Sequence, residues 1–305
     1  MKTSKHFSFR TLSFFLLLIA LLESHDAPAQ TDSLRMKIAD NARLAKGNVG
    51  VALLDLEKGD TLSFNGESHF PMQSVFKFPL AMAVLHQVDR GVLSLDQKIH
   101  IKKKDLLPDT WSPLRDKYPE GDVEVPLREI LVYTISQSDN NGCDILFRLL
   151  GGPGNVDTYI HSLGVEKIAI AATEEEMHKD WNVQFTNWNE PLGMTRLLDI
   201  FFKRKILSAA SSDFLWETMS RTTTGPKRIK GLLPLGVIVA HKSGSSGVDD
   251  KGIAAATNDV GIVTLPDGRH FAIVVYVSNS AADEETRDLV IAKISKAAWD
   301  YFVEH

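Results

Sequence analysis

The hydrophobic pattern near the N-terminus predicts a helix followed by a β-hairpin. Residues 32–44 carry apolar side chains at helical spacing and contain no glycine or proline. Residues 48–55 are almost continuously apolar, which is typical of a buried strand, and residues 61–65 alternate apolar and polar side chains. Lys58-Gly59-Asp60 supplies a turn between them. We therefore expect two paired strands early in the chain.

The middle of the chain changes to helical spacing. A helix from Ser74 to about Asp89 is expected to stop at Gly91, and Pro79 in its early turns removes one backbone donor. Residues 173–189 mix polar and aromatic side chains without a period, and they predict a long structured loop. Further helices are expected over residues 127–136, 143–150, 156–163, 195–204 and 212–221.

The last third returns to β-structure and ends in a helix. Residues 236–244, 252–265 and 270–277 predict three strands of a meander, and residues 284–304 predict an amphipathic helix. The chain order predicts an α+β fold: an antiparallel sheet of about five strands, flanked by N- and C-terminal helices, with an inserted all-helical domain. The sheet domain would comprise residues 30–68 and 222–305, the helical domain residues 69–221, and a site is expected in the cleft between them.

The first 29 residues have the pattern of a secretory signal peptide. Three basic residues precede an apolar segment of 11 residues, 12–22, and Ala27-Pro28-Ala29 is a small-x-small cleavage site. An uncleaved anchor would need a longer segment, so we expect export to the periplasm and no membrane association after cleavage. Cys143 is the single cysteine, which excludes an internal disulfide, and its apolar surroundings predict an inert buried thiol.

Composition excludes several functional classes. The 305 residues are 44% hydrophobic and 24% charged, as in ordinary globular proteins. The formal net charge is -5 and no basic block is longer than Lys102-Lys103-Lys104, which argues against a nucleic-acid partner. The ten histidines are scattered and no His-Glu-x-x-His motif occurs. We expect neither a metal site nor a cofactor.

Ser74 and Lys77 form the first candidate for catalysis. They lie three residues apart in an otherwise apolar segment, the only Ser-x-x-Lys of the chain. On a helix this spacing places both side chains on one face. A serine hydroxyl needs a base within hydrogen-bond reach to become a nucleophile, and a lysine in apolar surroundings has a lowered pKa and can accept or relay a proton.

Two further short motifs follow Ser-x-x-Lys along the chain. Ser138-Asp139-Asn140 comes directly after an apolar helix, and Lys242-Ser243-Gly244 ends an apolar strand. Each alone is an ordinary capping or turn sequence. Together with Ser-x-x-Lys, however, Ser-Asp-Asn and Lys-Thr-Gly are the signature of penicillin-recognising serine enzymes, and Lys-Ser-Gly keeps the hydroxyl of Lys-Thr-Gly.

On these motifs the chain resembles the class A serine β-lactamases, and within them the PER/VEB-like extended-spectrum subgroup. The likeness covers nearly the whole mature chain and includes residues 71–73, 105–108, 111–113, 174–188 and 222–225. It implies the serine β-lactamase and penicillin-binding transpeptidase-like fold, with an Ω-type loop at about 172–189. It also implies hydrolysis of penicillins and cephalosporins through a serine acyl-enzyme, antibiotic resistance, a β-lactam as the small-molecule partner, and a monomer.

The resemblance assigns a role to individual residues. Ser74 would attack the lactam carbonyl, Lys77 and Ser138 would carry protons, and Glu174 would activate the deacylating water. The acylation base stays open between Lys77 and Glu174. The residues implied in substrate binding are Asn140 for the side-chain amide, Lys242 and Ser243 for the carboxylate, Gly244 for close approach, Ser245 for the oxyanion hole with Ser74, Trp111 for an aromatic wall, and Arg228, or less favourably Lys251, for support.

The choice of Glu174 depends on register within an acidic run. Glu174, Glu175 and Glu176 are consecutive, and His178 stands four residues after the first of them. Most class A enzymes have an asparagine at that position, which helps to hold the water, whereas the PER-like subgroup has histidine. His178 is therefore a candidate for contacting that water, and it can also be a loop histidine held by backbone contacts.

Two other functions fit the same motifs. A D,D-peptidase of cell-wall synthesis shares Ser-x-x-Lys and the later lysine, but Glu174 with its loop argues against it. A β-lactam sensor would be acylated and stay so. Sensors are usually tethered to a membrane domain, and no later segment of this sequence has the length and hydrophobicity to cross a membrane.

Overall fold

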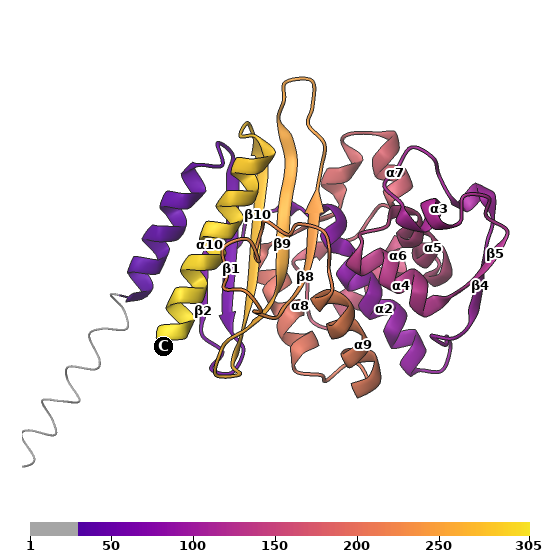
Figure 1. Ribbon diagram of the computed structural model, residues 1–305, viewed down its shortest axis with the longest axis horizontal. Helices are drawn as coiled ribbons and strands as arrows, with labels where there is room; N and C mark the ends of the chain where they lie inside the picture. Colours follow the sequence, from indigo (N-terminus) through magenta and orange to yellow (C-terminus); the bar gives the residue numbers. More distant parts are fainter. Residues whose placement is uncertain (1–29) are drawn as a thin grey trace, which may run out of the picture.

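The computed structural model describes residues 30–305, so the predicted signal peptide lies outside the described residues. Its centre is a five-stranded antiparallel sheet with the order β2-β1-β10-β9-β8 (Figure 1). The predicted α+β fold with five strands drawn from both ends of the chain is confirmed. The strands are β1 (Asn48–Asp55), β2 (Thr61–Phe64), β8 (Val239–Ser245), β9 (Ala254–Thr264) and β10 (His270–Ser280).

Two helices cover the outer face of this sheet. The N-terminal helix over residues 30–43 and the C-terminal helix α10 (Glu284–Glu304) lie side by side there (Figure 1). Apolar side chains of these helices, such as Ile38 and Ile294, share one core with side chains of the sheet such as Val275 on β10, and all three are fully buried. Asp283 caps α10 by accepting a hydrogen bond from the backbone N–H of Thr286 at 2.7 Å.

The inner face of the sheet packs against the helical part of the chain. Apolar side chains of β1, β9 and β10 join those of the helices in one continuous core. These helices are α2 (Lys77–Asp89), α3 (Pro113–Lys117), α4 (Leu127–Ser136), α5 (Asn140–Leu150), α6 (Pro153–Ser162), α8 (Pro191–Phe202) and α9 (Ala209–Ser220). The division into two domains stays a prediction.

The inserted part is not all-helical, contrary to expectation. β4 (Lys98–Ile101) pairs with β5 (Val123–Pro126), and a second small sheet has the order β3-β7-β6. Its strands are β3 (Phe70–Pro71), β7 (Trp188–Asn189) and β6 (Ile168–Ala169). Strands of two to four residues are too short to produce a period in sequence, and their pairing is set by partners far along the chain.

The segment 173–189 is more regular than the predicted loop. It contains a short helix, α7 (Glu174–Lys179), and a 3-10 turn, η3 (Val183–Thr186). Thr173 and Glu176 form a capping box at the start of α7. The pattern Thr-x-x-Glu is a recognised signal for the start of a helix. No apolar residues at helical spacing follow it, so the hydrophobic pattern does not predict α7.

Two further properties follow from the core. Cys143 is fully buried, and burial raises the pKa of its thiol well above the usual value, in keeping with an inert side chain. Between residues 30 and 305, no helix combines the length and hydrophobicity that crossing a membrane requires.

Candidate active site

Ser74 lies on a 3-10 turn, η1 (Gln73–Phe76), that runs directly into α2. Gln73 adopts a left-handed backbone conformation with φ of 48°, and its side-chain amide donates to Gln184 Oε1 at 2.5 Å. This hydrogen bond ties the turn to η3. Lys77, the first residue of α2, is fully buried, while Ser74 is partly exposed. The turn therefore presents the hydroxyl to the cavity and keeps the amine beneath it.

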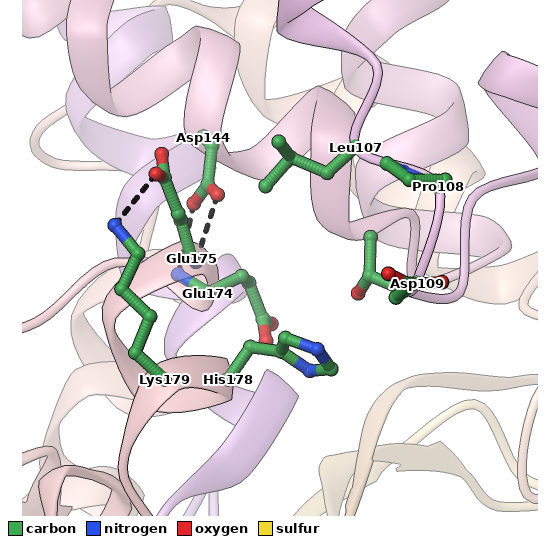
Figure 2. A pocket seen from close by; sticks show the side chains of 9 residues that line it. Leu107, Pro108, Asp109, Asp144, Glu174, Glu175, His178 and Lys179 are labelled. Carbon is green, nitrogen blue, oxygen red and sulfur yellow. Dashed lines mark hydrogen bonds and ion pairs between the residues drawn. The ribbon is translucent and has the colours of Figure 1, made fainter.

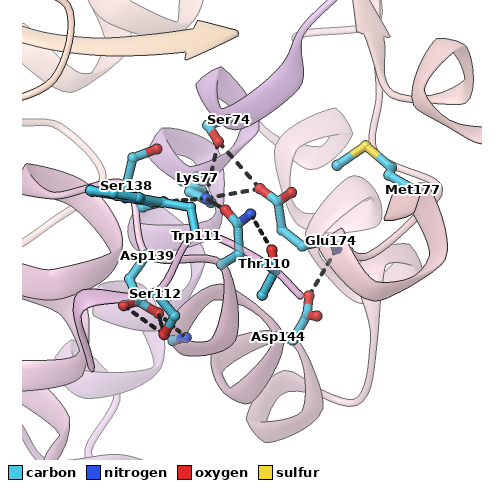
Figure 3. A network of polar contacts seen from close by, with 12 residues as sticks. Ser74, Lys77, Thr110, Trp111, Ser112, Ser138, Asp139, Asp144, Glu174 and Met177 are labelled. Atoms are coloured by element: carbon cyan, nitrogen blue, oxygen red, sulfur yellow. Dashed lines mark hydrogen bonds and ion pairs between the residues drawn. The ribbon is translucent and has the colours of Figure 1, made fainter. Parts of the chain in front are cut away.

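The amine of Lys77 is the centre of the polar network (Figure 3). Lys77 Nζ donates to Ser74 Oγ at 3.0 Å and lies 2.8 Å from Glu174 Oε1. It also donates to the carbonyl oxygen of Ser138 at 2.8 Å and to Asn140 Oδ1 at 2.5 Å. Ser74 Oγ in turn donates to Glu174 Oε1 at 3.3 Å. Both candidate bases are thus within hydrogen-bond reach of the Ser74 hydroxyl.

Ser138 is held in the loop between α4 and α5. Its backbone is left-handed, with φ of 60°. The next residue, Asp139, is fully buried and caps α5 by accepting from the Gly142 N–H at 2.7 Å. Asp139 also accepts from the Leu114 N–H at 2.6 Å and from the Ser112 hydroxyl. Burial raises the pKa of Asp139. The middle residue of the motif therefore fixes its two neighbours in place.

Lys242 reaches the network from the sheet. It is fully buried on β8, and its Nζ donates to Ser138 Oγ at 2.9 Å and to the Ser243 carbonyl oxygen at 2.7 Å. Burial, followed by the charge of Lys77, lowers the pKa of Lys242 well below its usual value. The Ser243 hydroxyl shares a hydrogen bond of 2.7 Å with Thr224 Oγ1. Ser138 therefore stands between two lysines.

Glu174 is aimed into the site by the carboxylate of Asp144 (Figure 2). Asp144, buried on α5, accepts from the backbone N–H groups of Glu174 at 2.8 Å and Glu175 at 2.9 Å. These are free donors at the start of α7. Burial, with the charge of Glu174 second, raises the pKa of Asp144 to about 7. Glu175 forms an ion pair with Lys179 at 2.8 Å, so only Glu174 of the three glutamates contacts Ser74 and Lys77.

Two adjoining cavities lie above these groups. The first, of about 440 Å³, is lined by Ser74, Asn140, Glu174 and Ser245 among others. The second, of about 180 Å³, lies between the 107–110 segment and α7 (Figure 2). Thr110, Glu174 and His178 line both. His178 is exposed at this junction.

Of the predicted substrate contacts, Asn140, Ser245 and His178 line the first cavity. The residues that do not line it are Lys242, Ser243 and Gly244 on β8, and Trp111, Arg228 and Lys251. Trp111 is 60% exposed and donates its ring N–H to the Gln137 carbonyl oxygen. Arg228 is buried, forms an ion pair with Asp288 at 2.7 Å, and donates to Ser245 Oγ at 2.7 Å. Lys251, the less favoured alternative to Arg228, is an exposed residue of the turn between β8 and β9.

Sequence reasoning missed several residues of the site. Thr110 accepts from Asn140 Nδ2 at 2.7 Å, and Gln73 and Gln184 hold the turn that carries Ser74. Asp144 orients α7. None of these belongs to a motif that predicts chemistry. An acidic residue next to a run of apolar residues within a predicted helix, as Asp144 is before Ile145, is the one signal that could have been used.

The chain resembles known enzymes over most of its length. It is 47% identical to β-lactamase VEB-1 of Pseudomonas aeruginosa over 90% of this chain and 92% of that protein. It is 42% identical to extended-spectrum β-lactamase PER-1 of the same species over 93% and 92%. The crystal structure of a β-lactamase from Chitinophaga pinensis superposes with a TM-score of 0.86 at 59% identity, covering 88% and 98%.

A serine hydroxyl within hydrogen-bond distance of a buried lysine and a glutamate, on this α+β fold, is typical of a hydrolase that works through an acyl-enzyme. The model of the β-lactamase enzyme family matches residues 33–302. The chain belongs to this family, as a class A serine β-lactamase of the PER/VEB-like subgroup. Its reaction is hydrolysis of the β-lactam ring, which gives antibiotic resistance.

Proposed function

We propose that Ser74 is the nucleophile and that the groups around it divide the proton transfers among them. Ser74 Oγ gives its proton to Lys77 or Glu174 and attacks the lactam carbonyl carbon. The geometry that supports this is the contact of Ser74 Oγ with Lys77 Nζ at 3.0 Å and Glu174 Oε1 at 3.3 Å. The backbone N–H groups of Ser74 and Ser245 stabilise the oxyanion that forms.

Ser138 completes acylation. As the carbon–nitrogen bond of the lactam breaks, the Ser138 hydroxyl protonates the leaving nitrogen, and a lysine replaces the lost proton. Support comes from the Lys242 Nζ to Ser138 Oγ hydrogen bond of 2.9 Å and from the Lys77 amine on the carbonyl oxygen of the same residue. Ring opening yields an ester between Ser74 and the acyl group.

Glu174 carries out deacylation. Its carboxylate removes a proton from a water molecule, whose oxygen attacks the ester carbonyl, and Ser74 leaves with a proton. The position of Glu174 Oε1 beside Ser74 Oγ and Lys77 Nζ supports this role, because the same carboxylate can then return the proton to the serine. His178, at the junction of the two cavities, contacts the water or the acyl side chain.

The substrate carboxylate binds Lys242 and Ser243, and Asn140 binds the side-chain amide. Gly244 allows the close approach of β8 to the acyl group. Arg228 supports this end of the strand, since it donates to the Gly244 carbonyl oxygen and to Ser245 Oγ. Trp111 forms an aromatic wall on the exposed side.

The substrate range includes extended-spectrum cephalosporins; in support, the PER-1 relative is named an extended-spectrum β-lactamase. We further propose that the enzyme acts in the periplasm as a monomer. Ser74, Lys77, Ser138, Glu174 and Lys242 all come from one chain, so the mechanism needs no second copy.

Turnover of a chromogenic cephalosporin, followed together with intact mass, tests this function. We expect many turnovers per enzyme and little trapped adduct, because Glu174 is placed to hydrolyse the ester. One equivalent of colour with a stable adduct would instead indicate a binding protein or a peptidase.

The identity of the nucleophile is tested by Ser74→Ala. This variant should lose covalent labelling by a penicillin completely, because no other hydroxyl contacts both Lys77 and Glu174 among residues 30–305. Intact mass detects the adduct, and Ser112→Ala provides a matched serine variant that should still be labelled. Labelling of Ser74→Ala at another serine would contradict the assignment.

A further inference from the structure

The segment 107–110 lines the site but belongs to no helix or strand. Thr110 lines both cavities, and Leu107, Pro108 and Asp109 line the second (Figure 2). The carbonyl groups of such a segment must find their donors outside regular secondary structure. These donors fix the shape of the space in which the side chain of a substrate can lie.

One guanidinium group holds most of this segment. Arg115 Nη1, on α3, donates to the carbonyl oxygens of Leu107 at 2.8 Å, Pro108 at 2.6 Å and Thr110 at 2.7 Å. Asn141 on α5 also contacts Leu107 through its side-chain amide. Within the described chain, however, the carbonyl groups of Pro108 and Thr110 accept from Arg115 alone. Hydrogen bonds from a charged donor are stronger than neutral ones, so the shape of the segment depends chiefly on Arg115.

The helix that carries Arg115 is itself fixed to the Ser138-Asp139-Asn140 motif. Ser112 caps α3 by accepting from the Arg115 N–H at 3.1 Å, and its hydroxyl donates to the buried carboxylate of Asp139 at 2.9 Å (Figure 3). Asp139 also accepts from the Leu114 N–H at 2.6 Å. Arg115 therefore connects the segment 107–110 to a rigid part of the site.

Thr110 links this segment to the amide of Asn140. Asn140 Nδ2 donates to Thr110 Oγ1 at 2.7 Å, and Asn140 Oδ1 accepts from Lys77 at 2.5 Å. The amide nitrogen carries two N–H groups, and Thr110 is its only acceptor among the described residues. Because Asn140 lines the first cavity, the second N–H can donate to the acyl amide of a substrate. Its direction depends on the position of Thr110.

We propose that Arg115 is a positioning residue for recognition of the acyl side chain. By holding the carbonyl groups of the segment 107–110 it fixes Thr110, and Thr110 directs the second N–H of Asn140 toward the acyl amide. Arg115 lines neither cavity and does not touch the substrate. The inference rests on the role proposed above for Asn140 in binding the side-chain amide.

Two substrates separate this role from a merely structural one. Benzylpenicillin and 6-aminopenicillanic acid share the bicyclic nucleus and the carboxylate, and only the first has an acyl amide. The ratio of their kcat/KM values measures the acyl preference, which the wild-type enzyme should show. Arg115→Ala should lower this ratio about tenfold, mainly by raising KM for benzylpenicillin, because the enzyme loses about one hydrogen bond to that substrate. A general loss of folded enzyme lowers both values together and leaves the ratio unchanged.

Two further variants serve as controls. All contacts of Arg115 with the segment come from one nitrogen, and an ammonium also offers several N–H groups on one nitrogen. Arg115→Lys should therefore keep more of the acyl preference than Arg115→Ala. Arg128→Ala removes an arginine of α4 that pairs with exposed Asp96 at 2.8 Å, and it should keep the preference in full.

Thr110→Val tests the link between Arg115 and Asn140, and it keeps the inference testable should Arg115→Ala fail to fold. It retains the shape of the side chain and removes the acceptor, so it should lose the preference to a similar extent. Adding Arg115→Ala should then change the ratio little further, because both act through one contact. Full preference in folded Arg115→Ala or in Thr110→Val, or additive losses in the double variant, would overturn the inference. A wild-type enzyme without acyl preference would instead overturn the role of Asn140, so the two failures are distinguishable.

Discussion

At the scale of single residues, the choice among three consecutive glutamates decides the chemistry. Glu174 points at Lys77 and Ser74, Glu175 pairs with Lys179, and Glu176 completes the capping box with Thr173. The three side chains are chemically identical, and only their direction from α7 separates the glutamate that contacts Ser74 and Lys77 from the other two.

Glu174→Gln should therefore convert the enzyme into an acyl trap. We expect acylation by a penicillin to stay detectable and deacylation to fall about 10²-fold or more, because glutamine cannot take a proton from water. Burst kinetics and intact mass measure the two steps. Glu176→Gln, which can still accept the Thr173 hydrogen bonds, should turn over normally, and normal turnover in Glu174→Gln would show that another group is the base.

At the scale of elements, α7 depends on α5. The two carboxylate oxygens of Asp144 accept from the first two N–H groups of α7. The position of Glu174 therefore depends on this contact with α5. The contact requires the Asp144 carboxylate to be buried close to Glu174. Burial, with the charge of Glu174 second, raises the pKa of Asp144 to about 7.

This pKa predicts a pH dependence of stability. The folded pKa lies above the unfolded value of about 3.9, so the favourable contribution of Asp144 is complete below about pH 4 and is lost as the pH rises to about 7. The loss is at most about 4 kcal/mol in the free energy of unfolding. Asp144→Asn cannot titrate and should lack this component, which urea unfolding at pH 4.5 and pH 8 measures.

Asp144→Asn also loses one hydrogen bond to α7, and this loss lowers the free energy of unfolding equally at both pH values. Exposed Asp40→Asn, on the N-terminal helix, is the control and should keep the wild-type pH dependence. An Asp144→Asn protein with the same pH dependence as wild type would mean that Asp144 does not titrate in this range.

At the scale of the whole molecule, the site exists only where the sheet meets the helical part. Lys242 and Ser245 come from β8, and Ser74, Lys77 and Glu174 come from η1, α2 and α7. Gly244 is the point of contact. A Cβ added there would lie 2.7 Å from the Met72 carbonyl oxygen and 3.1 Å from the Ser74 backbone nitrogen.

Gly244→Ala should therefore displace β8 from the turn that carries Ser74. We expect kcat/KM to fall about 10²-fold, because small misplacements of reacting groups have effects of this size, while the fold is retained. Activity and thermal unfolding are measured together. Gly154→Ala on α6, where an added Cβ meets nothing within 4 Å, should change neither strongly. Wild-type activity in Gly244→Ala would mean that β8 and the turn can move apart to fit the added Cβ without loss of activity.

The sequence by itself determined the strands of the main sheet, most of the helices and the three motifs of the site. Their apolar runs, periods and spacings are local properties, legible without knowledge of distant partners. The sequence did not predict the short strands β3 to β7 or the short helices α3 and α7, because segments of two to six residues obtain their order from contacts with the rest of the chain.

Only the tertiary structure decided how these parts act together. It directs Glu174 rather than its neighbours toward Ser74, places the Asp144 carboxylate at the first N–H groups of α7, and joins Arg228 to Ser245 by a hydrogen bond. Each of these relations joins residues that belong to different elements. Direction, burial and charge balance depend on all the elements packed around a group, and no local pattern carries that information.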